Sequence, residues 1–310
     1  MTTDTGAPAR SARGTLGVLE AALAAALWGL SGPISKLAMQ GGVEPRALLV
    51  LRLWISGLLM VGWLVVRRPA ALRLPRPLWI PVALLGLAMA ALQLFYYLTI
   101  QAANVATAVF LEYLAPTIVV LYGWLSGRQA RERWSVLAVA TALAGSYLLV
   151  ATSGAGQGGL AISPRALGTG LGAAGTLALQ AILLERLVGR CQGPTLFLYA
   201  TAAAALVALA IGDPSSVAHV PTDFRTIAAL SYIILGATIA PLLLLMAAVD
   251  KIGAAKAGVT NTLEPVVAGL AAVPILGEAI SASQWVGGLL IVVAVVFISR
   301  APSPHRPAGG

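Results

Sequence analysis

The chain is dominated by apolar stretches that are each long enough to cross a lipid bilayer as a helix. A spanning helix needs about 20 apolar residues. Hydrophobic residues make up 59% of the 310 residues and charged residues only 10%, whereas a soluble domain carries about 25% charged residues. We therefore predict an all-α integral membrane protein with ten transmembrane helices, at 16–39, 44–66, 78–101, 104–126, 133–151, 165–187, 194–212, 226–249, 254–276 and 282–300.

The ten predicted spans divide into two sets of five. An odd number of spans makes the second set enter the membrane from the opposite side, which is the inverted-repeat arrangement of many secondary transporters. We expect five-helix repeats at 16–151 and 164–300, joined by a periplasmic or extracellular linker at 152–163, with cytoplasmic tails at 1–15 and 301–310.

Basic residues are distributed unevenly between the two sides of this topology. With the N-terminus inside, fifteen lysines and arginines fall on the cytoplasmic side and four, Lys36, Arg46, Arg165 and Arg225, on the other. Cytoplasmic loops carry the excess of such residues, so we expect a multi-pass protein of the cell (inner or plasma) membrane with both termini cytoplasmic. The net charge of +9 forms no basic stripe or tail, which argues against nucleic-acid binding.

Two glutamates lie next to prolines inside apolar stretches. Glu112 comes four residues before Pro116, and Glu264 directly precedes Pro265. A shift of 149 residues places Pro116 on Pro265 but places Glu112 on Asn261. A proline inside a span disturbs the helix and frees a carbonyl upstream. The two prolines therefore predict equivalent kinks, whereas the two acids are predicted to have different roles.

Each of these acids allows a functional and a structural interpretation. A charged side chain deep in a bilayer costs roughly 2.5–3.5 kcal/mol on insertion scales. Either Glu112 faces a cavity and binds a substrate ammonium or a proton, or it forms a structural ion pair with Arg52, which lies at similar depth in the second span. Glu264 either binds a cation or relays a proton at a broken turn, or it is protonated and hydrogen-bonded across a helix contact.

Other small or polar residues within the spans are weaker candidates. Trp28, Ser31 and Pro33 predict either a break in the first span, which would open backbone groups to substrate, or close helix packing. Asn261 and Thr262 adjoin Glu264 and are better candidates. Further residues for a polar path, each equally explained by a packing hydrogen bond, are Gln93, Tyr96, Tyr97, Tyr113 and Gln180, and the predicted kinks or gating positions are Pro33, Pro116, Pro241 and Pro265.

Several motifs resemble the ten-helix EamA-type transporters of the drug/metabolite transporter superfamily. They are "ALWGLSGPISKLAM", "LLVLRLWISG", "NVATAVFLEYLAPTIVVLYGWLSGR", "GAAKAGVTNTLEPVVAGLAAVPILGEAIS" and "QWVGGLLIVVAVVF". The resemblance covers about 16–300 and implies two inverted five-helix repeats around a central cavity, lined mainly by spans 1, 3, 4, 6, 8 and 9. The LEP motif is common in the family across substrates, which favours a structural or gating role for Glu264. The family's "GE" after the fourth span is replaced here by "SGRQARER".

These patterns together favour a secondary transporter. We predict an exporter of amino acids or related small metabolites that works by alternating access, with proton exchange through Glu112 or Glu264 and facilitated diffusion both left open. A multidrug or toxic-compound exporter and a small-solute importer fit the same fold. The chain has no G-x-x-x-x-G-K-[ST] sequence, which excludes ATP as the driving force through that motif.

The sequence lacks the residues that the other function classes require. An intramembrane enzyme needs paired acids, a metal motif or a serine with a base, but no H-E-x-x-H occurs and both histidines lie outside the spans. A channel would need a repeated filter-type loop, and the sequence has none. We therefore expect no enzyme activity, no cofactor and no metal, and a monomer or weak homo-oligomer whose partners are the lipid bilayer and a small-molecule substrate.

Overall fold

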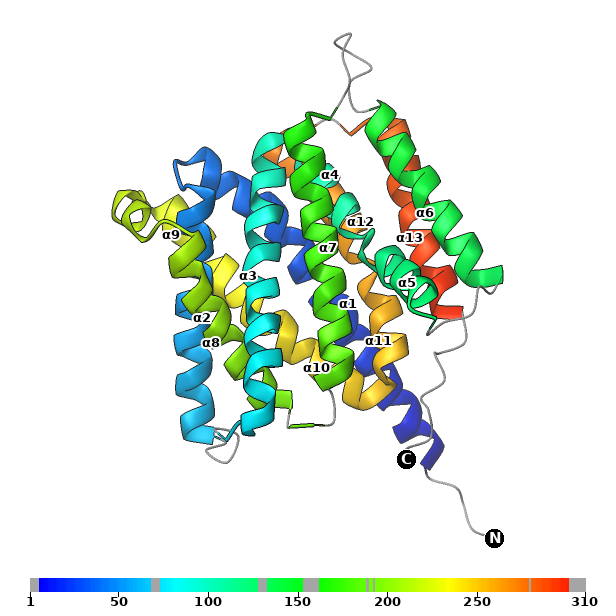
Figure 1. Cartoon of the computed structure of the whole chain (residues 1–310), viewed down its shortest axis with the longest axis horizontal. Coiled ribbons are helices and arrows are strands. Elements are labelled where there is room, and N and C mark those ends of the chain that lie inside the picture. The colour runs from blue at the N-terminus through cyan, green and yellow to red at the C-terminus, as the bar shows by residue number, and fades with distance from the viewer. Residues whose placement is uncertain are drawn as a thin grey trace.

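The structure of the chain is a computed structural model, and every element in its described part is a helix. It describes residues 6–67, 73–127, 133–152, 162–187, 190–191, 193–278 and 280–300. The helices run back and forth through one bundle (Figure 1). In order they are α1 (Gly6–Gln40), α2 (Pro45–Arg67), η2 (Arg76–Leu78), α3 (Trp79–Ala102), α4 (Val105–Glu112), α5 (Ala115–Leu125), α6 (Arg133–Thr152), α7 (Pro164–Leu187), α8 (Gly193–Ile211), η3 (Pro214–His219), α9 (Phe224–Ser231), η4 (Tyr232–Ile239), α10 (Ala240–Ile252), α11 (Ala254–Asn261), α12 (Glu264–Leu276) and α13 (Ala282–Arg300).

Within these ranges, six helical segments are long and apolar enough to cross a membrane. Four shorter apolar helices accompany them and lie within the remaining four stretches that the sequence predicts as spans. The all-helical, multi-pass class is therefore confirmed. The six segments are Gly14–Gln40, Pro45–Arg67, Arg76–Ala102, Val105–Leu125, Pro164–Leu187 and Phe224–Ile252, and the shorter helices are Arg133–Gly145, Thr195–Ile211, Glu264–Leu276 and Ala282–Phe297.

Two of the predicted spans are each broken into two helices. The first break, at residues 113–114, separates α4 from α5, and the second, at residues 262–263, separates α11 from α12. The helix ends on either side of the two breaks are related by the same 149-residue shift that relates Pro116 to Pro265. Each proline lies in the first turn of the second helix, where its missing N–H is tolerated. At both predicted kinks, at Pro116 and at Pro265, the structure has one helix ending and another beginning.

The first span is not broken, contrary to one of the two expectations. α1 continues through Ser31 and Pro33 as one helix. Its small residues allow close packing instead: a Cβ on Gly29 would lie 2.7 Å from the carbonyl oxygen of Glu264, and one on Gly32 would lie 2.5 Å from the Tyr96 hydroxyl. The alternative interpretation of this segment, close helix packing, is the one that the structure supports.

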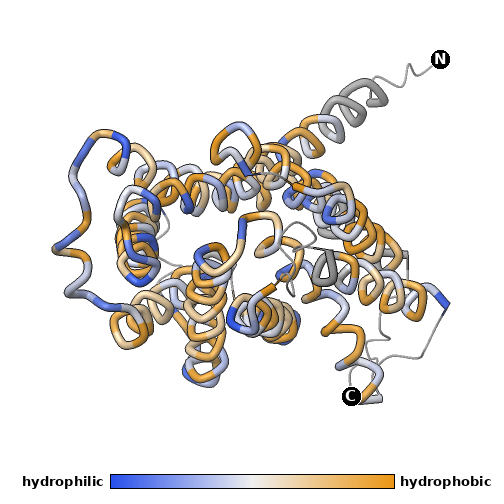
Figure 2. Tube along the Cα trace, turned by 90° about the horizontal axis from the view of Figure 1, so that it is seen from above, coloured by the Kyte–Doolittle hydropathy of each residue, from blue (hydrophilic) through white to orange (hydrophobic). Residues whose placement is uncertain are grey.

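The two halves of the sequence interleave in the bundle. α1 packs against α10 and α12, α3 packs against α7 and α8, and α6 packs along α13 (Figure 1). Hydrophobic residues run along the helices, and the most hydrophilic positions gather in the connecting segments (Figure 2). Each half therefore depends on the other for its buried surface.

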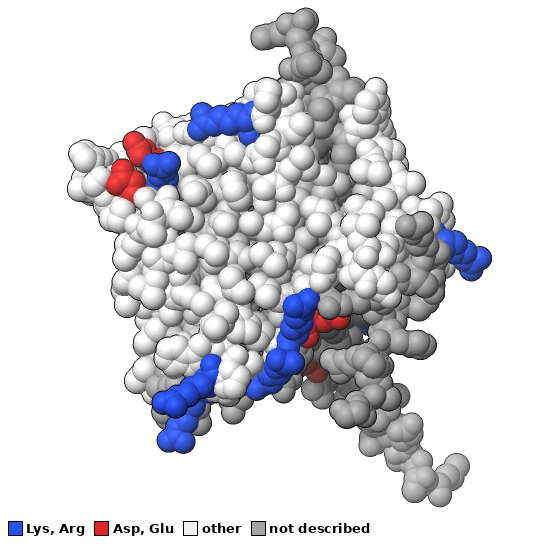
Figure 3. Space-filling model, in the orientation of Figure 1, with Lys and Arg blue, Asp and Glu red and all other residues white. Residues whose placement is uncertain are grey.

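Charged residues gather at the two ends of the bundle. The end at which α1 begins, called here the basic end, carries most of the described lysines and arginines, and the opposite end, called the far end, carries fewer (Figure 3). The described residues at the basic end are Arg67, Arg73, Arg76, Arg133, Arg186, Arg190, Lys251 and Lys256, and those at the far end are Lys36, Arg46, Arg165 and Arg225.

Candidate functional site

The two helix breaks are joined through one tyrosine. Tyr113, in the α4–α5 break, has its hydroxyl 3.0 Å from Oε2 of Glu264, the first residue of α12, and 3.2 Å from the carbonyl oxygen of Asn261, the last residue of α11. The amide of Asn261 donates a longer bond of 3.4 Å to the same Glu264 oxygen. Polar groups from equivalent breaks of the two halves therefore form one cluster, called here the centre.

Pro265 explains why the Asn261 carbonyl needs a side-chain donor. In a continuous helix the N–H of residue 265 would bond to the carbonyl of residue 261, but proline has no N–H. A carbonyl without a partner inside a bilayer is costly, and neighbouring side chains commonly satisfy it. The Tyr113 hydroxyl is positioned to do so from the other break.

Glu112 differs from Glu264 in its surroundings. It is half-buried as the last residue of α4, and no described side chain or backbone group donates a hydrogen bond to its carboxylate. Glu112 nevertheless lies close enough to Glu264 and Arg52 to interact electrostatically with both. Pro116 also removes the N–H that would bond to the Glu112 carbonyl. The two acids therefore have different environments.

Arg52 is buried, with only 5% of its surface exposed, and is surrounded by neutral oxygens. Its Nη1 donates to Gln93 Oε1 at 3.0 Å, to the Tyr97 hydroxyl at 2.9 Å and more weakly to Ser31 Oγ at 3.5 Å. The expected alternative of an ion pair with Glu112 is not formed: within the described ranges the ion pairs are Lys36–Glu278 and Glu20–Lys251. Arg52 instead joins α2 to α1 and α3 through hydrogen bonds to neutral acceptors.

The remaining Arg52 contacts hold a distorted segment ahead of Pro241. Nη2 donates to the carbonyl of Ala237 at 2.9 Å, and Nε donates to Thr238 Oγ1 at 2.8 Å. These acceptors belong to the π-helical segment η4, which is followed by α10 with Pro241 in its first turn. Ala237 lies four residues before Pro241 and would lose its α-helical donor to the proline. Pro241 was predicted as a kink, and the distortion lies immediately before it.

Some of the other predicted residues contact Arg52, and the rest lie elsewhere in the bundle. Ser31, Gln93 and Tyr97 meet at Arg52, whereas Gln180 donates to the carbonyl of Ala88 at 3.1 Å and so links α7 to α3. Tyr96 is buried beside Gly32, Trp28 on α1 is half-buried, and Thr262 lies in the second break. The sequence did not predict the role of Thr238, because an isolated threonine in an apolar stretch does not indicate a contact with a distant arginine.

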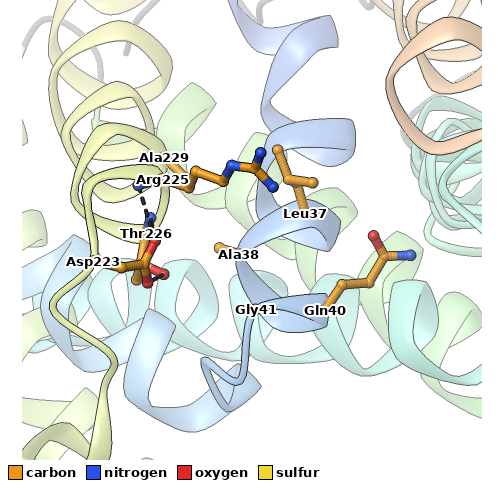
Figure 4. Close-up of a pocket in the computed structure, with 8 residues that line it drawn as sticks. All are labelled: Leu37, Ala38, Gln40, Gly41, Asp223, Arg225, Thr226 and Ala229. Atoms are coloured by element: carbon orange, nitrogen blue, oxygen red, sulfur yellow. Dashed lines mark hydrogen bonds between the residues drawn. The ribbon is translucent and has the colours of Figure 1, made fainter.

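Two grooves are lined by residues other than those of the centre. One, of about 250 Å³, is formed at the far end by the end of α1 and the start of α9, where Asp223 caps α9 and Arg225 extends toward Leu37 (Figure 4). The other, of about 280 Å³, is entirely apolar and is lined by residues of α4, α12 and α13. Within the described ranges, no three His, Cys, Asp or Glu residues gather as metal ligands.

Comparisons with known proteins identify the fold in both halves of the chain. The EamA-like transporter family matches residues 15–151 and again residues 165–300. The uncharacterized inner membrane transporter YicL of Salmonella typhimurium is 28% identical over 287 residues, covering 91% of this chain and 95% of its own. The uncharacterized transporter YwfM of Bacillus subtilis is 26% identical over 300 residues, covering 96% and 98%. A solved crystal structure at 23% identity, covering 93% of this chain and 96% of its own, has a TM-score of 0.59, which shows a shared fold.

Proposed function

Because this chain belongs to the EamA-like transporter family, we propose that it is a secondary transporter that exports amino acids or related small metabolites by alternating access. It is a membrane transporter, and both named relatives are transporters, which is consistent with a carrier rather than an enzyme. The proposed topology has ten spans in two inverted five-helix repeats. The equivalent breaks at residues 113–114 and 262–263 support it, as do six long and four shorter apolar helices.

The proposed orientation has the basic end in the cytoplasm. Lysines and arginines accumulate on the cytoplasmic side of membrane proteins, and the described ones are concentrated at that end. Both termini are then cytoplasmic, and the far end faces outward. The carrier is proposed to act as a monomer or weak homo-oligomer without a nucleic-acid partner.

One observation carries the substrate class: the open groups in the centre and at the neighbouring Glu112 are acceptors. The Glu112 carboxylate receives no hydrogen bond from the described residues, and the side-chain oxygen of Asn261 is buried without a partner. A cluster of free oxygens next to carboxylates suits a group that brings several N–H donors and a positive charge. A primary ammonium, as in an amino acid, has three such donors. Glu264 already accepts from Tyr113 and Asn261, so we assign the ammonium or a coupling proton to Glu112 and a structural or gating role to Glu264.

Proton coupling follows from the same arrangement. Glu112 and Glu264 interact electrostatically with each other, so two negative charges at the centre repel unless a cation or a proton lies between them. A carrier that exchanges a proton for an ammonium substrate at Glu112 avoids this repulsion in both loaded states. Facilitated diffusion is the alternative if the proton and the substrate do not compete.

Transport by reconstituted protein tests these proposals. Liposomes would be offered labelled amino acids, a cationic drug and a nucleoside, with and without a pH gradient, and Glu112→Gln and Glu264→Gln would be measured in parallel. We expect saturable amino-acid flux that the gradient drives to accumulation, and we expect Glu112→Gln to abolish the drive while exchange continues only at a raised KM, because an amide binds an ammonium more weakly than a carboxylate does. Flux that ignores the gradient and a fully active Glu112→Gln would overturn the proton mechanism. Saturable flux of the drug or nucleoside alone would overturn the amino-acid assignment.

A further inference from the structure

Two ion pairs attach the same helix, α1, to the second half of the chain. Near the far end, Lys36 Nζ lies 2.6 Å from a carboxylate oxygen of Glu278, in the connection between α12 and α13. Near the basic end, Lys251 Nζ at the end of α10 lies 2.7 and 2.8 Å from the two oxygens of Glu20. Among the described residues, α1 therefore has one charged contact with the second half toward each end.

The polar centre lies between these pairs along α1. Glu20 and Lys36 are sixteen positions apart on one unbroken helix, which is roughly 24 Å at the rise of an α-helix, close to the ~30 Å of a hydrocarbon core. Gly29, which packs against the Glu264 carbonyl, and Ser31, which contacts Arg52, lie between them. Each pair is thus placed between the centre and one end of the bundle.

The exposure of the two pairs suits contacts that form and break. The side chains of Lys36 and Glu278 are 19% and 11% exposed, and those of Lys251 and Glu20 are 20% and 17% exposed. A fully exposed ion pair contributes almost no stability to the closed contact. Fully buried charges, in contrast, cannot separate without a large desolvation cost. Partly exposed charges can separate at a lower desolvation cost than buried ones while still favouring the closed contact.

The far-end pair also holds the helix that ends at Glu112. Both oxygens of Glu278 accept from the backbone N–H of Val105, the first residue of α4, at 3.3 and 3.4 Å, and Lys36 donates to the carbonyl of Ala103 at 3.3 Å. A carboxylate at a helix N-terminus is favourable. The pair thereby fixes the outer end of the eight-residue helix whose last residue is Glu112. Separation of the pair releases that end.

We propose that Lys36–Glu278 and Glu20–Lys251 are the two gates of the carrier, which open alternately on the far side and the basic side. The inference rests on the alternating access and the orientation proposed above. A two-state carrier needs contacts whose energy differs between its states, and these pairs connect α1 to elements of the second half on either side of the centre. Breaking one gate then favours the state that is open on that side and disfavours the other.

Thiol labelling of the centre tests this without a transported substrate. A Cys191→Ser background removes the sole native thiol, and Thr262→Cys places a reporter at the half-buried second break. A charged, membrane-impermeant thiol reagent is applied to intact cells and, separately, to inside-out vesicles. Glu278→Gln or Lys36→Gln should raise labelling from outside by roughly fivefold or more, the lower range of coupling between two states, and lower labelling from inside. Glu20→Gln or Lys251→Gln should do the reverse.

Controls separate gating from loss of structure. Arg186→Gln removes a surface hydrogen bond to Tyr122 that belongs to neither gate, and it should leave both labelling rates unchanged. The exchange Glu20→Lys with Lys251→Glu restores the opposite charges and should return labelling to its starting values. Labelling that rises from both sides in every gate variant, or that does not change, would overturn the proposal. Reciprocal labelling without any transported solute would retain the gates and count against the proposed substrate class instead.

Discussion

The hydroxyl of Tyr113 lies 3.0 Å from the Glu264 carboxylate, and this contact joins the broken helix of the first half to the broken helix of the second. The same hydroxyl lies 3.2 Å from the Asn261 carbonyl, which Pro265 deprives of a helical donor. The one hydroxyl proton of Tyr113 therefore lies between two acceptors, the Glu264 carboxylate and a carbonyl that a continuous helix would satisfy itself. The first half of the chain thus supplies a hydrogen-bond donor to the break in the second half.

Tyr113→Phe removes this donor and keeps the ring. We expect it to destabilise the protein by roughly 1–2 kcal/mol, because the Glu264 carboxylate and the Asn261 carbonyl lose a hydrogen bond in a water-poor place. The measurement is the melting temperature of purified protein in detergent. Tyr122→Phe is the matched control, since the hydroxyl of Tyr122 accepts from Arg186 at an exposed position. Equal melting temperatures for the two variants would mean that the bridge between the breaks contributes no stability.

Arg52→Lys keeps the charge and changes the geometry. A lysine ammonium has three donors on a flexible stem and cannot reproduce the planar fork that reaches Gln93, Tyr97 and Ala237. We expect a loss on the order of 3 kcal/mol, because a single ammonium reaches fewer of these buried acceptors and leaves the others without a donor. The yield of monodisperse protein and its melting temperature would be compared with those of Arg46→Lys, an exposed position on the same helix. An unaffected Arg52→Lys would show that only the charge matters.

Proline positions carried most of what the sequence could predict about the centre. The 149-residue shift between Pro116 and Pro265 predicts equivalent kinks, because proline acts on its own backbone and needs no knowledge of its neighbours. The same rule predicts that residues 237 and 261 have carbonyls without a helical donor. It does not say which side chain satisfies them, because Arg52 and Tyr113 reach them from distant parts of the sequence.

The partner of Arg52 illustrates this limit. Similar depth in the membrane made Glu112 a reasonable candidate, but depth does not fix the direction in which two helices face each other. Thr238, Gln93 and Tyr97 surround the guanidinium because of how η4 and α3 pack against α2. Pro33 shows that a proline alone does not predict a break. α1 continues through it as one helix, and Gly29 and Gly32 pack closely against neighbouring helices.

The cap of α9 predicts a local effect of acid at the far end. Asp223 accepts from the Thr226 hydroxyl at 2.6 Å and from the backbone N–H groups of Arg225 and Thr226. These bonds, led by the one from the Thr226 side chain, hold the pKa of Asp223 below its ordinary value. A carboxylate whose pKa is lower in the folded state contributes stability above its unfolded pKa and loses it as the pH falls through the folded pKa.

Hydrogen exchange across residues 224–231 measures this effect. Protection of these amides should decrease below about pH 4, the range in which an ordinary aspartate takes up its proton, after correction for the intrinsic pH dependence of exchange. Asp223→Ala should lower protection already at neutral pH and remove the further acid response. Protection in the parent protein that stays constant on acidification would show that Asp223 does not hold the start of α9.

Gly29→Ala tests the contact between α1 and the second break. The new methyl group would lie 2.7 Å from the Glu264 carbonyl oxygen and 2.8 Å from the Val267 side chain, so α1 and α12 must separate to accommodate it. We expect a cost of about 1–3 kcal/mol, as for other overpacked sites, together with weaker transport, because α12 begins at Glu264. Gly62→Ala on α2 is the matched control, since nothing lies within 4 Å of its added carbon. If both variants retain the melting temperature and flux of the parent protein, the close approach at Gly29 is not required for the centre.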